Sequence, residues 1–372
     1  MMEQTSRATD FLILTTHNSL GGTLVVIDDL RRDANELGFS VNVICLYNSE
    51  NRSSGAGQNV LQTGDGPARR LMAIISLYLE LRQQKPRAIL TVLPVANVVG
   101  CICAALNRIP KRVATHHGPS SSQRFPLRVL DLILGTLGVY SNVVCVSVAA
   151  KDSFRRYPSW YRKRISVILN EVRRFSREPH KSRTRAHYGI STDATVFTMV
   201  GRLTDQKNIL NSIRAIAAVP NVFLVIAGDG PLLQEAVATA RQLACSHRVK
   251  LLGNVERDKV ADILSASDVF FQPSLFEGRS IALLEAVQAG LPIIASNITS
   301  QTEVLRLASG AIAGLVCDPH DVNDMSCTLA RLAESSALRD EYRKLTHQLR
   351  HESSGDLGMV KAYLSLLGVL HR

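Results

Sequence analysis

The stretch FLILTTHNSLGGTLVVIDDLRRDANELGFSVNVICL, residues 11–46, contains a complete strand-helix-strand unit. The apolar run Phe11–Thr15 is typical of a buried strand, and residues 23–37 carry apolar side chains at helical spacing up to Gly38. A second apolar run at residues 41–46 predicts the next strand. Two strands joined by a helix lie parallel in one sheet, so the unit indicates an α/β fold.

The same alternation continues along the chain in two series, separated by a polar, arginine-rich stretch. In the first series we expect helices at 67–84, 97–107 and 126–137 and strands at 88–93, 112–115 and 142–147. In the second we expect strands at 195–200, 222–227, 249–252, 269–272 and 292–295, and helices at 209–218, 232–244, 257–265 and 281–289. This pattern predicts two doubly wound Rossmann-like domains that face each other across a ligand-binding cleft.

The expected boundaries follow from this division. Residues 1–172 form an N-terminal, acceptor-side domain, 173–188 a basic linker, and 189–355 a C-terminal, nucleotide-binding domain. Residues 356–372 predict a terminal helix that packs back on the first domain.

Charge is the unusual feature of the composition. Of 372 residues 46% are hydrophobic, as in a globular protein, but the formal net charge is +11. Residues 151–187 hold 12 basic residues against 3 acidic ones, a local charge of +9. Such a segment attracts phosphate on a nucleotide, a nucleic acid or an anionic lipid. The segment also contains four aromatic residues, Phe154, Tyr157, Trp160 and Tyr161. Aromatic rings among arginines predict an interfacial membrane anchor, and the alternative is a solvated linker.

The cysteine pattern and the N-terminus indicate a cytoplasmic protein. Seven cysteines in apolar contexts do not form a disulfide framework, and the spacing of Cys101 and Cys103 favours core packing over zinc binding, so no metal is expected. Residues 1–10 lack the apolar core of a signal peptide, and the apolar run at 88–106 is interrupted by Pro94, Asn97 and Gly100. We therefore expect a cytoplasmic location. The basic, aromatic segment adds the expectation of peripheral attachment to the inner face of the membrane.

Two short segments predict anion-binding groups. Arg202 and Lys207 follow the strand at 195–200, where two cations can clamp a diphosphate, or can simply be solvated loop charges. Gly21 and Gly22 precede the first helix, so backbone N–H groups there can face an anion. The pair lacks the G-x-G-x-x-G pattern, which counts against a nicotinamide site.

The stretch FEGRSIALLE, residues 276–285, places two carboxylates eight residues apart. Glu277 lies in a loop with Gly278 at the turn, and Glu285 lies about two turns, roughly 12 Å, into the next helix. That span is comparable to the reach of a nucleotide sugar, so one carboxylate can bind sugar hydroxyls and the other the ribose. Backbone N–H groups of Arg279, Ser280 and Ile281 at the helix start can meet phosphate.

This stretch resembles the E-x7-E signature of family 4 glycosyltransferases, which are retaining enzymes of the GT-B fold, and further matches extend over nearly the whole chain. The matches resemble those of family members that synthesise bacterial surface polysaccharides. The matching segments are Gly21–Gly22 with Leu37–Gly38, Val113–Gly118, Val144–Lys151, Val200–Leu203 with Lys207, Ile226–Pro231, Leu252–Gly253, Ser267–Asp268 and Ala289–Ile293.

The resemblance implies a role for each matching residue. Arg202 and Lys207 would hold the donor diphosphate, Glu277 the donor sugar and Glu285 the ribose, while His117 would contact the sugar from the other domain. His116 is the adjacent alternative to His117. One departure concerns the end of the first domain, where Glu171 replaces a glycine that is common in relatives, which puts acceptor-side contacts in doubt.

The implied function is a metal-independent and cofactor-independent transfer of a hexose-type sugar. The donor would be a UDP- or GDP-sugar, the acceptor a saccharide or lipid-linked saccharide, and a donor phosphate oxygen would accept the acceptor proton. The alternatives are a sugar-nucleotide epimerase of the same architecture and, from charge alone, a nucleic-acid-binding protein.

Overall fold

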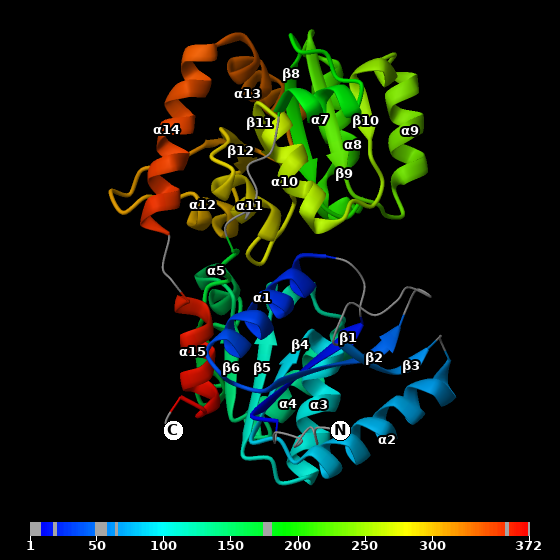
Figure 1. The fold of residues 1–372 in the computed structure, drawn as a ribbon, viewed down its shortest axis with the longest axis vertical. Coiled ribbons are helices and arrows are strands. Elements are labelled where there is room, and N and C mark those ends of the chain that lie inside the picture. Colours follow the sequence, from blue (N-terminus) through cyan, green and yellow to red (C-terminus); the bar gives the residue numbers. More distant parts are fainter. Residues whose placement is uncertain are drawn as a thin grey trace, which may run out of the picture. The chain divides into compact units, whose positions relative to one another are not determined.

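The computed structural model describes residues 9–17, 21–48, 58–63, 66–173, 181–353 and 357–370 (Figure 1). The chain divides into two compact units. The first comprises Met1–Glu171 together with Asp356–Arg372, and the second comprises Val172–Gly355.

The first unit is built on a parallel sheet with strand order β3-β2-β1-β4-β5-β6-β7. Phe11 of β1 pairs with Val41 of β2 on one side and with Ala88 of β4 on the other, so β1 is central. The strands are β1 Phe11–His17, β2 Val41–Asn48, β3 Gln58–Thr63, β4 Ala88–Val92, β5 Lys111–His116, β6 Asn142–Cys145 and β7 Ile165–Val167.

Helices cover both faces of this sheet, since right-handed connections on the two sides of β1 and β4 place helices on opposite faces. α2 packs on α3 and α3 on α4, whereas α1 packs on α15 (Figure 1). The long helices are α1 Gly22–Glu36, α2 Pro67–Gln84, α3 Pro94–Leu106, α4 Phe125–Thr136 and α15 Gly358–Leu367. The short ones are η1 Ser120–Ser122, α5 Val148–Asp152 and α6 Ser159–Arg162.

The second unit has a parallel sheet of order β10-β9-β8-β11-β12-β13. Its strands are β8 Thr195–Val200, β9 Val222–Ala227, β10 Val249–Leu251, β11 Val269–Gln272, β12 Ile293–Ser296 and β13 Leu315–Cys317. Its helices are α7 Lys181–His187, η2 Asp205–Lys207, α8 Ile209–Ala217, α9 Leu233–Gln242, η3 Ser246–Arg248, α10 Arg257–Ala266, α11 Ile281–Gln288, α12 Thr299–Val304, α13 Val322–Glu334 and α14 Ser336–Glu352.

Every helix and strand that the sequence predicts is present, and α2, β8, β9 and β11 have the predicted bounds. The strand expected at 142–147 ends earlier, at Cys145, because Ser147 is the N-cap of α5 and accepts a hydrogen bond from the N–H of Ala150. Not predicted were β3, β7, β13, α5, α6, α7 and α12 to α14.

Part of the range expected to be a basic linker is folded into the second unit. Residues 174–180 lie outside the described residues, but 181–187 form α7, which packs on α10. Lys181 Nζ and Arg185 Nη2 lie 2.6 and 2.7 Å from the carboxylate of Asp268. Burial raises the pKa of Asp268, but hydrogen bonds from Lys181 and the Val196 N–H and the two nearby cations lower it by more, so the net shift is downward. These basic side chains are thus held by an internal carboxylate.

The aromatic membrane anchor predicted in residues 154–161 is wrong for three of its four rings. Phe154 and Tyr161 are fully buried and Tyr157 is partly buried, and the three pack on one another with centroid distances of 4.9 to 5.8 Å. Trp160 alone is exposed, at 59%. These buried rings form the core beneath β5 and β6, so they cannot insert into lipid.

Six of the seven cysteines are buried in this fold, and Cys327 is exposed. Cys101 and Cys103 are buried, as predicted, and burial raises the pKa of the Cys101 thiol to about 12. Within the described ranges, none of the helices combines the length and the apolarity needed to cross a lipid bilayer.

Candidate active site

The second sheet has a topological switch point between β8 and β11. From β8 the chain adds β9 and β10 on one side, and then returns to add β11, β12 and β13 on the other. Ligands of doubly wound sheets bind at such a point, beyond the carboxyl ends of the strands. Residues 201–208 and 273–280 are the loops that leave β8 and β11 there.

Glycines allow the loops after β8 and β9 to meet backbone to backbone. A Cβ on Gly228 would lie 1.8 Å from the carbonyl oxygen of Gly201, and one on Gly230 would lie 2.4 Å from the carbonyl oxygen of Leu203. Both glycines are therefore required sterically. The N–H of Leu203 donates to Asp229 O at 3.0 Å, which fixes the loop that carries Arg202.

Two amide side chains join the loops on either side of the switch point. Gln206 Nε2 donates to Phe276 O at 3.0 Å, and the N–H of Leu275 donates to Gln206 O at 2.9 Å. Asn208 Nδ2 donates to Pro273 O and to Pro319 O, at 3.1 and 2.6 Å. These hydrogen bonds tie the two loops together.

An ion pair lies at the centre of this assembly. Lys207 Nζ is 2.6 Å from Glu277 Oε1, and the two side chains are 14% and 8% exposed. Nε2 groups of Gln206 and Gln272 each lie 3.4 Å from a Glu277 oxygen. Removing one member of so buried a pair leaves the other charge uncompensated, which typically costs about 3–5 kcal/mol.

The helix after this loop orients the remaining predicted groups. Ser280 caps α11, accepting from the N–H of Leu283 at 3.4 Å and donating to Gln272 Oε1 at 3.0 Å. Ile281 and Glu285 are 7% and 6% exposed, and Gly278 is buried at the turn. The Arg279 side chain is directed to Glu303, 4.0 Å away, so Arg279 can offer an anion its backbone N–H while its guanidinium is engaged.

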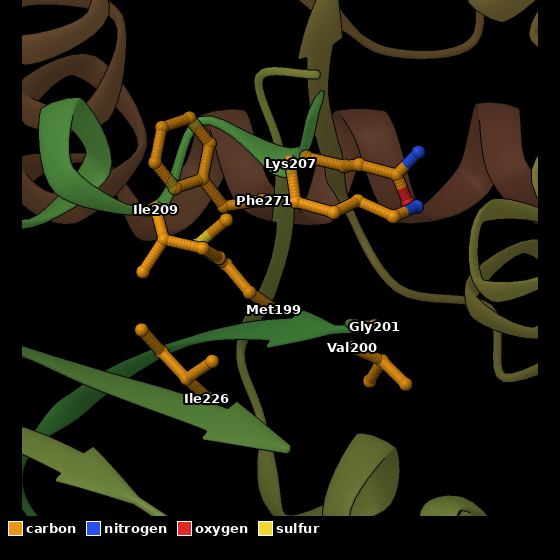
Figure 2. Close-up of a pocket in the computed structure, with 8 residues that line it drawn as sticks. Met199, Val200, Gly201, Lys207, Ile209, Ile226 and Phe271 are labelled. Atoms are coloured by element: carbon orange, nitrogen blue, oxygen red, sulfur yellow. The ribbon is translucent and has the colours of Figure 1, made fainter. Parts of the chain in front are cut away.

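Lys207 and Gln272 also line a pocket at the end of β8. Figure 2 shows Met199, Ile209, Ile226 and Phe271 gathered on one side, while Lys207 extends past them. The pocket is apolar inside and polar where Lys207 and Gln272 lie. Arg202, on the same loop, is exposed and reachable by a ligand.

In the first unit, Gly22 begins α1 and Gly21 precedes it, and both are exposed at the carboxyl end of β1. His116 and His117 lie at the carboxyl end of β5. His116 is 2% exposed, and its ring nitrogens lie 3.1 Å from Gln123 Nε2 and 3.3 Å from the Tyr161 hydroxyl. Its ring therefore belongs to a buried network, whereas His117 is partly exposed.

Hydrogen bonding assigns the tautomer of His117. The Thr115 hydroxyl donates to Thr91 O at 2.8 Å, so its oxygen must accept from His117 Nε2, 3.2 Å away. Nε2 then carries the proton, and Nδ1 has the lone pair. Such a neutral imidazole can accept a hydrogen bond from a hydroxyl group.

We expect His117 to stay neutral well below pH 6.5. Burial, and then the charge of His116, lower its pKa from 6.5 to about 4. Because the unfolded protein binds the proton more readily, this group reduces stability as the pH falls from 6.5 toward 4. Histidine-ring NMR titration, with His117→Asn to assign the resonance, should give a midpoint near 4; a midpoint at 6.5 or above would contradict the assignment.

Gln206, Asn208 and Gln272 were missed by sequence reasoning. Gln272 ends the otherwise apolar strand Val269–Gln272, where a lone polar residue was a usable signal. Gln206 and Asn208 flank Lys207, but nothing in their sequence pattern indicates that they tie two distant loops together.

Comparison with known proteins covers both units. Residues 20–173 match the family model described as Glycosyltransferase Family 4, and residues 180–348 match that described as Glycosyl transferases group 1. The UDP-Gal:alpha-D-GlcNAc-diphosphoundecaprenol alpha-1,3-galactosyltransferase of Escherichia coli is 30% identical over 285 residues, 72% of each chain. The lipopolysaccharide core biosynthesis glycosyltransferase LpsD of Rhizobium meliloti is 29% identical, over 68% of this chain and 72% of its own.

Solved structures share the architecture at low sequence identity. Anabaena HepE, in complex with UDP and glucose, has a TM-score of 0.80 at 17% identity, over 95% of this chain and 98% of its own. WaaG, a glycosyltransferase involved in lipopolysaccharide biosynthesis, has a TM-score of 0.75 at 15% identity, over 97% of this chain and 100% of its own. The predicted α/β fold of the GT-B type is confirmed.

Proposed function

The chain belongs to glycosyltransferase family 4, and from that premise we propose that it transfers a hexose-type sugar from a uridine diphosphate sugar to a lipid-linked saccharide, with retention of configuration. The observation that carries this proposal is the buried pair of Lys207 and Glu277 at the switch point, within the E-x7-E stretch.

The donor assignment rests on the charges at this point. Lys207, the exposed Arg202 and the N–H groups of residues 279–281 are the groups we assign to the diphosphate. Glu285 is assigned to the ribose and Glu277 to the sugar hydroxyls. Uridine is favoured over guanosine because the E. coli relative is named for UDP-Gal and HepE was solved with UDP.

The ion pair suggests how donor binding and catalysis are coupled. Without donor, Lys207 and Glu277 neutralise each other. When the diphosphate enters, its negative charge takes over as the partner of Lys207, and Glu277 becomes able to accept hydrogen bonds from sugar hydroxyls. The two residues can then act on opposite ends of the bond that breaks.

The reaction we propose needs neither a metal nor a cofactor. The bond between the anomeric carbon and the diphosphate oxygen breaks, the acceptor oxygen bonds to the same face of that carbon, and a phosphate oxygen takes the acceptor proton. Lys207, Arg202 and the α11 N-terminus stabilise the charge on the leaving diphosphate. For His117, Gly21 and Gly22 the assignment to donor contacts rests on the resemblance of their motifs.

The proposed acceptor class follows from the named relatives. One acts on a diphosphoundecaprenol-linked sugar and another in lipopolysaccharide core synthesis. We assign this chain to the same kind of bacterial surface-glycan synthesis, in the cytoplasm and at the membrane surface. Both relatives are named as transferases, which favours a transfer reaction over epimerisation or nucleic-acid binding for this chain.

A donor screen tests this proposal. Thermal unfolding with UDP-, GDP- and ADP-hexoses should show stabilisation by a UDP-sugar, about 2.7 kcal/mol at one hundred times its Kd. The shift should be unchanged by EDTA, since no metal is involved. Equal or absent stabilisation with all three nucleotides would contradict the donor assignment.

A further inference from the structure

Exposed apolar side chains are concentrated on three helices of the first unit. Eleven large apolar residues that are 37% to 74% exposed lie on α2, α3 and α4 or at the C-cap of α4. The described part of the second unit exposes three, at 41% to 44%. The eleven are Leu71, Met72, Ile75, Leu79, Ile102, Leu106, Phe125, Val129, Leu130, Ile133 and Leu137.

These residues form stripes on neighbouring helices. On α2 they follow the spacing i, i+1, i+4 and i+8, and on α4 the spacing i, i+4, i+5, i+8 and i+12, so each helix has a second apolar side. The inward side of each helix is a different one and is buried in the first unit. Its buried residues include Leu77 and Leu81 on α2, and Asp131 and Gly135 on α4. Because α3 packs against both α2 and α4, the stripes lie on one layer of helices.

The segment that contains these helices is positively charged. Residues 67–137 hold 10 basic residues and 2 acidic ones, Glu80 and Asp131, a net charge of +8. Asp131 is only 2% exposed and binds the Tyr161 hydroxyl, so it does not neutralise the surface. Arg124 and Arg108 are exposed near the ends of the apolar stripes, and the Arg128 guanidinium lies over the Phe125 ring.

We propose that the outward face of α2, α3 and α4 docks on an anionic lipid bilayer, with its apolar stripes inserted at the headgroup level. The apolar residues can insert at the headgroup level, and the arginines beside them are attracted to anionic headgroups. A second copy of this chain is a poorer occupant, because the self-facing contact of a symmetric dimer would bring the exposed Arg108 and Arg124 at the edge of one copy's stripes close to those of the other. This inference rests on the proposed function, because docking would bring the enzyme to the membrane that holds its lipid-linked acceptor.

Vesicle co-sedimentation tests the docking with a matched control. The full chain should sediment with vesicles of equal parts phosphatidylglycerol and phosphatidylcholine, and much less with phosphatidylcholine alone. Replacing Leu79, Phe125 and Leu137 by serine should lower the partition coefficient about tenfold or more, because all three side chains are more than half exposed and removing them takes away inserted area. Leu243→Ser with Val316→Ser, which removes exposed apolar residues of the second unit, should not.

A charge variant and a fluorescence probe complete the test. Arg108→Gln with Arg124→Gln should weaken binding to anionic vesicles, and Arg241→Gln with Lys344→Gln should not. The chain has a single tryptophan, so Trp160→Phe gives a background in which Leu79→Trp, Leu137→Trp or Leu243→Trp reports one position. Brominated lipid should quench tryptophan at 79 and 137 and leave 243 unquenched.

Equal sedimentation of the serine variant and the wild type, a wild type that binds neither vesicle, or equal quenching at 243 would overturn the docking surface. Loss of a dimer, rather than of vesicle binding, in the serine variant would assign the face to a second copy instead. The serine variant should retain wild-type affinity for UDP, measured by calorimetry, so failure of docking and failure of the proposed donor function are separately visible.

Discussion

Replacing Lys207 by alanine should lower kcat about 10²–10³-fold, the usual effect of removing one group that stabilises charge developing in a transition state. The lysine Nζ lies 2.6 Å from Glu277, in the loop that leads into α11, where we place the departing diphosphate. Because that charge is largest after the bond to the sugar has broken, kcat should fall more than the apparent donor affinity. The measurement is the rate of UDP release at saturating donor.

Stability must be separated from catalysis in this experiment. Lys207→Ala leaves Glu277, at 8% exposure, without its cation, so the single variant should lower the thermal unfolding temperature. Adding Glu277→Gln should restore much of the stability but not the activity. Lys259→Ala, an exposed lysine on α10 of the same unit, is the matched control and should change neither. A Lys207→Ala enzyme with wild-type kcat would remove Lys207 from the leaving-group site.

Glu285→Ala should raise the Kd for UDP at least about a hundredfold. A carboxylate that accepts two hydroxyl hydrogen bonds loses about 1.5–3 kcal/mol for each when it is removed. Glu285 is 6% exposed on α11, two turns beyond the loop of Glu277, so water cannot readily replace it. Isothermal calorimetry with UDP measures the change directly.

Two further variants make the result specific. Glu285→Gln keeps one acceptor and should weaken UDP less than alanine does. Glu334→Ala removes an exposed carboxylate from α13 and should leave the affinity unchanged. If Glu285→Ala folds and binds UDP as the wild type does, the ribose lies elsewhere.

The sequence predicted those parts of the fold that local patterns encode. Strands β8, β9 and β11 are short, mostly apolar runs, and their bounds were found correctly. The three-residue strands β7 and β13 are too short to show a period, and they exist because a neighbouring strand offers free backbone groups. Tertiary pairing of this kind is not visible in a local window.

The aromatic residues of the basic segment show how composition can mislead. Phe154 and Tyr157 lie between α5, which ends at Asp152, and α6, which begins at Ser159, whereas Tyr161 lies on α6. No single helix period therefore joins the three rings, and they are buried by packing on one another and on β5 and β6, which a local window of sequence does not show. The exposed apolar surface instead lies on α2, α3 and α4, where it resembles ordinary helix periodicity in sequence.

For the candidate site, motif and spacing identified Arg202, Lys207, Glu277 and Glu285, and the structure brings Lys207 and Glu277 together. Spacing did not predict that these two would pair with each other, because 70 residues separate them in the chain. Likewise, the adjacent His116 and His117 look equivalent in sequence. They differ because the His116 ring faces the buried Tyr161 and Gln123, while His117 is hydrogen bonded to Thr115.

The central claim is that this chain is a retaining transferase that uses a UDP-sugar, and proton NMR of the transfer product tests it most directly. With the UDP-α-hexose selected by the donor screen and a lipid-linked saccharide acceptor, we expect UDP release together with a new anomeric signal whose coupling constant is that of an α-linkage. A β-linked product, or an epimerised nucleotide sugar formed without transfer, would contradict it.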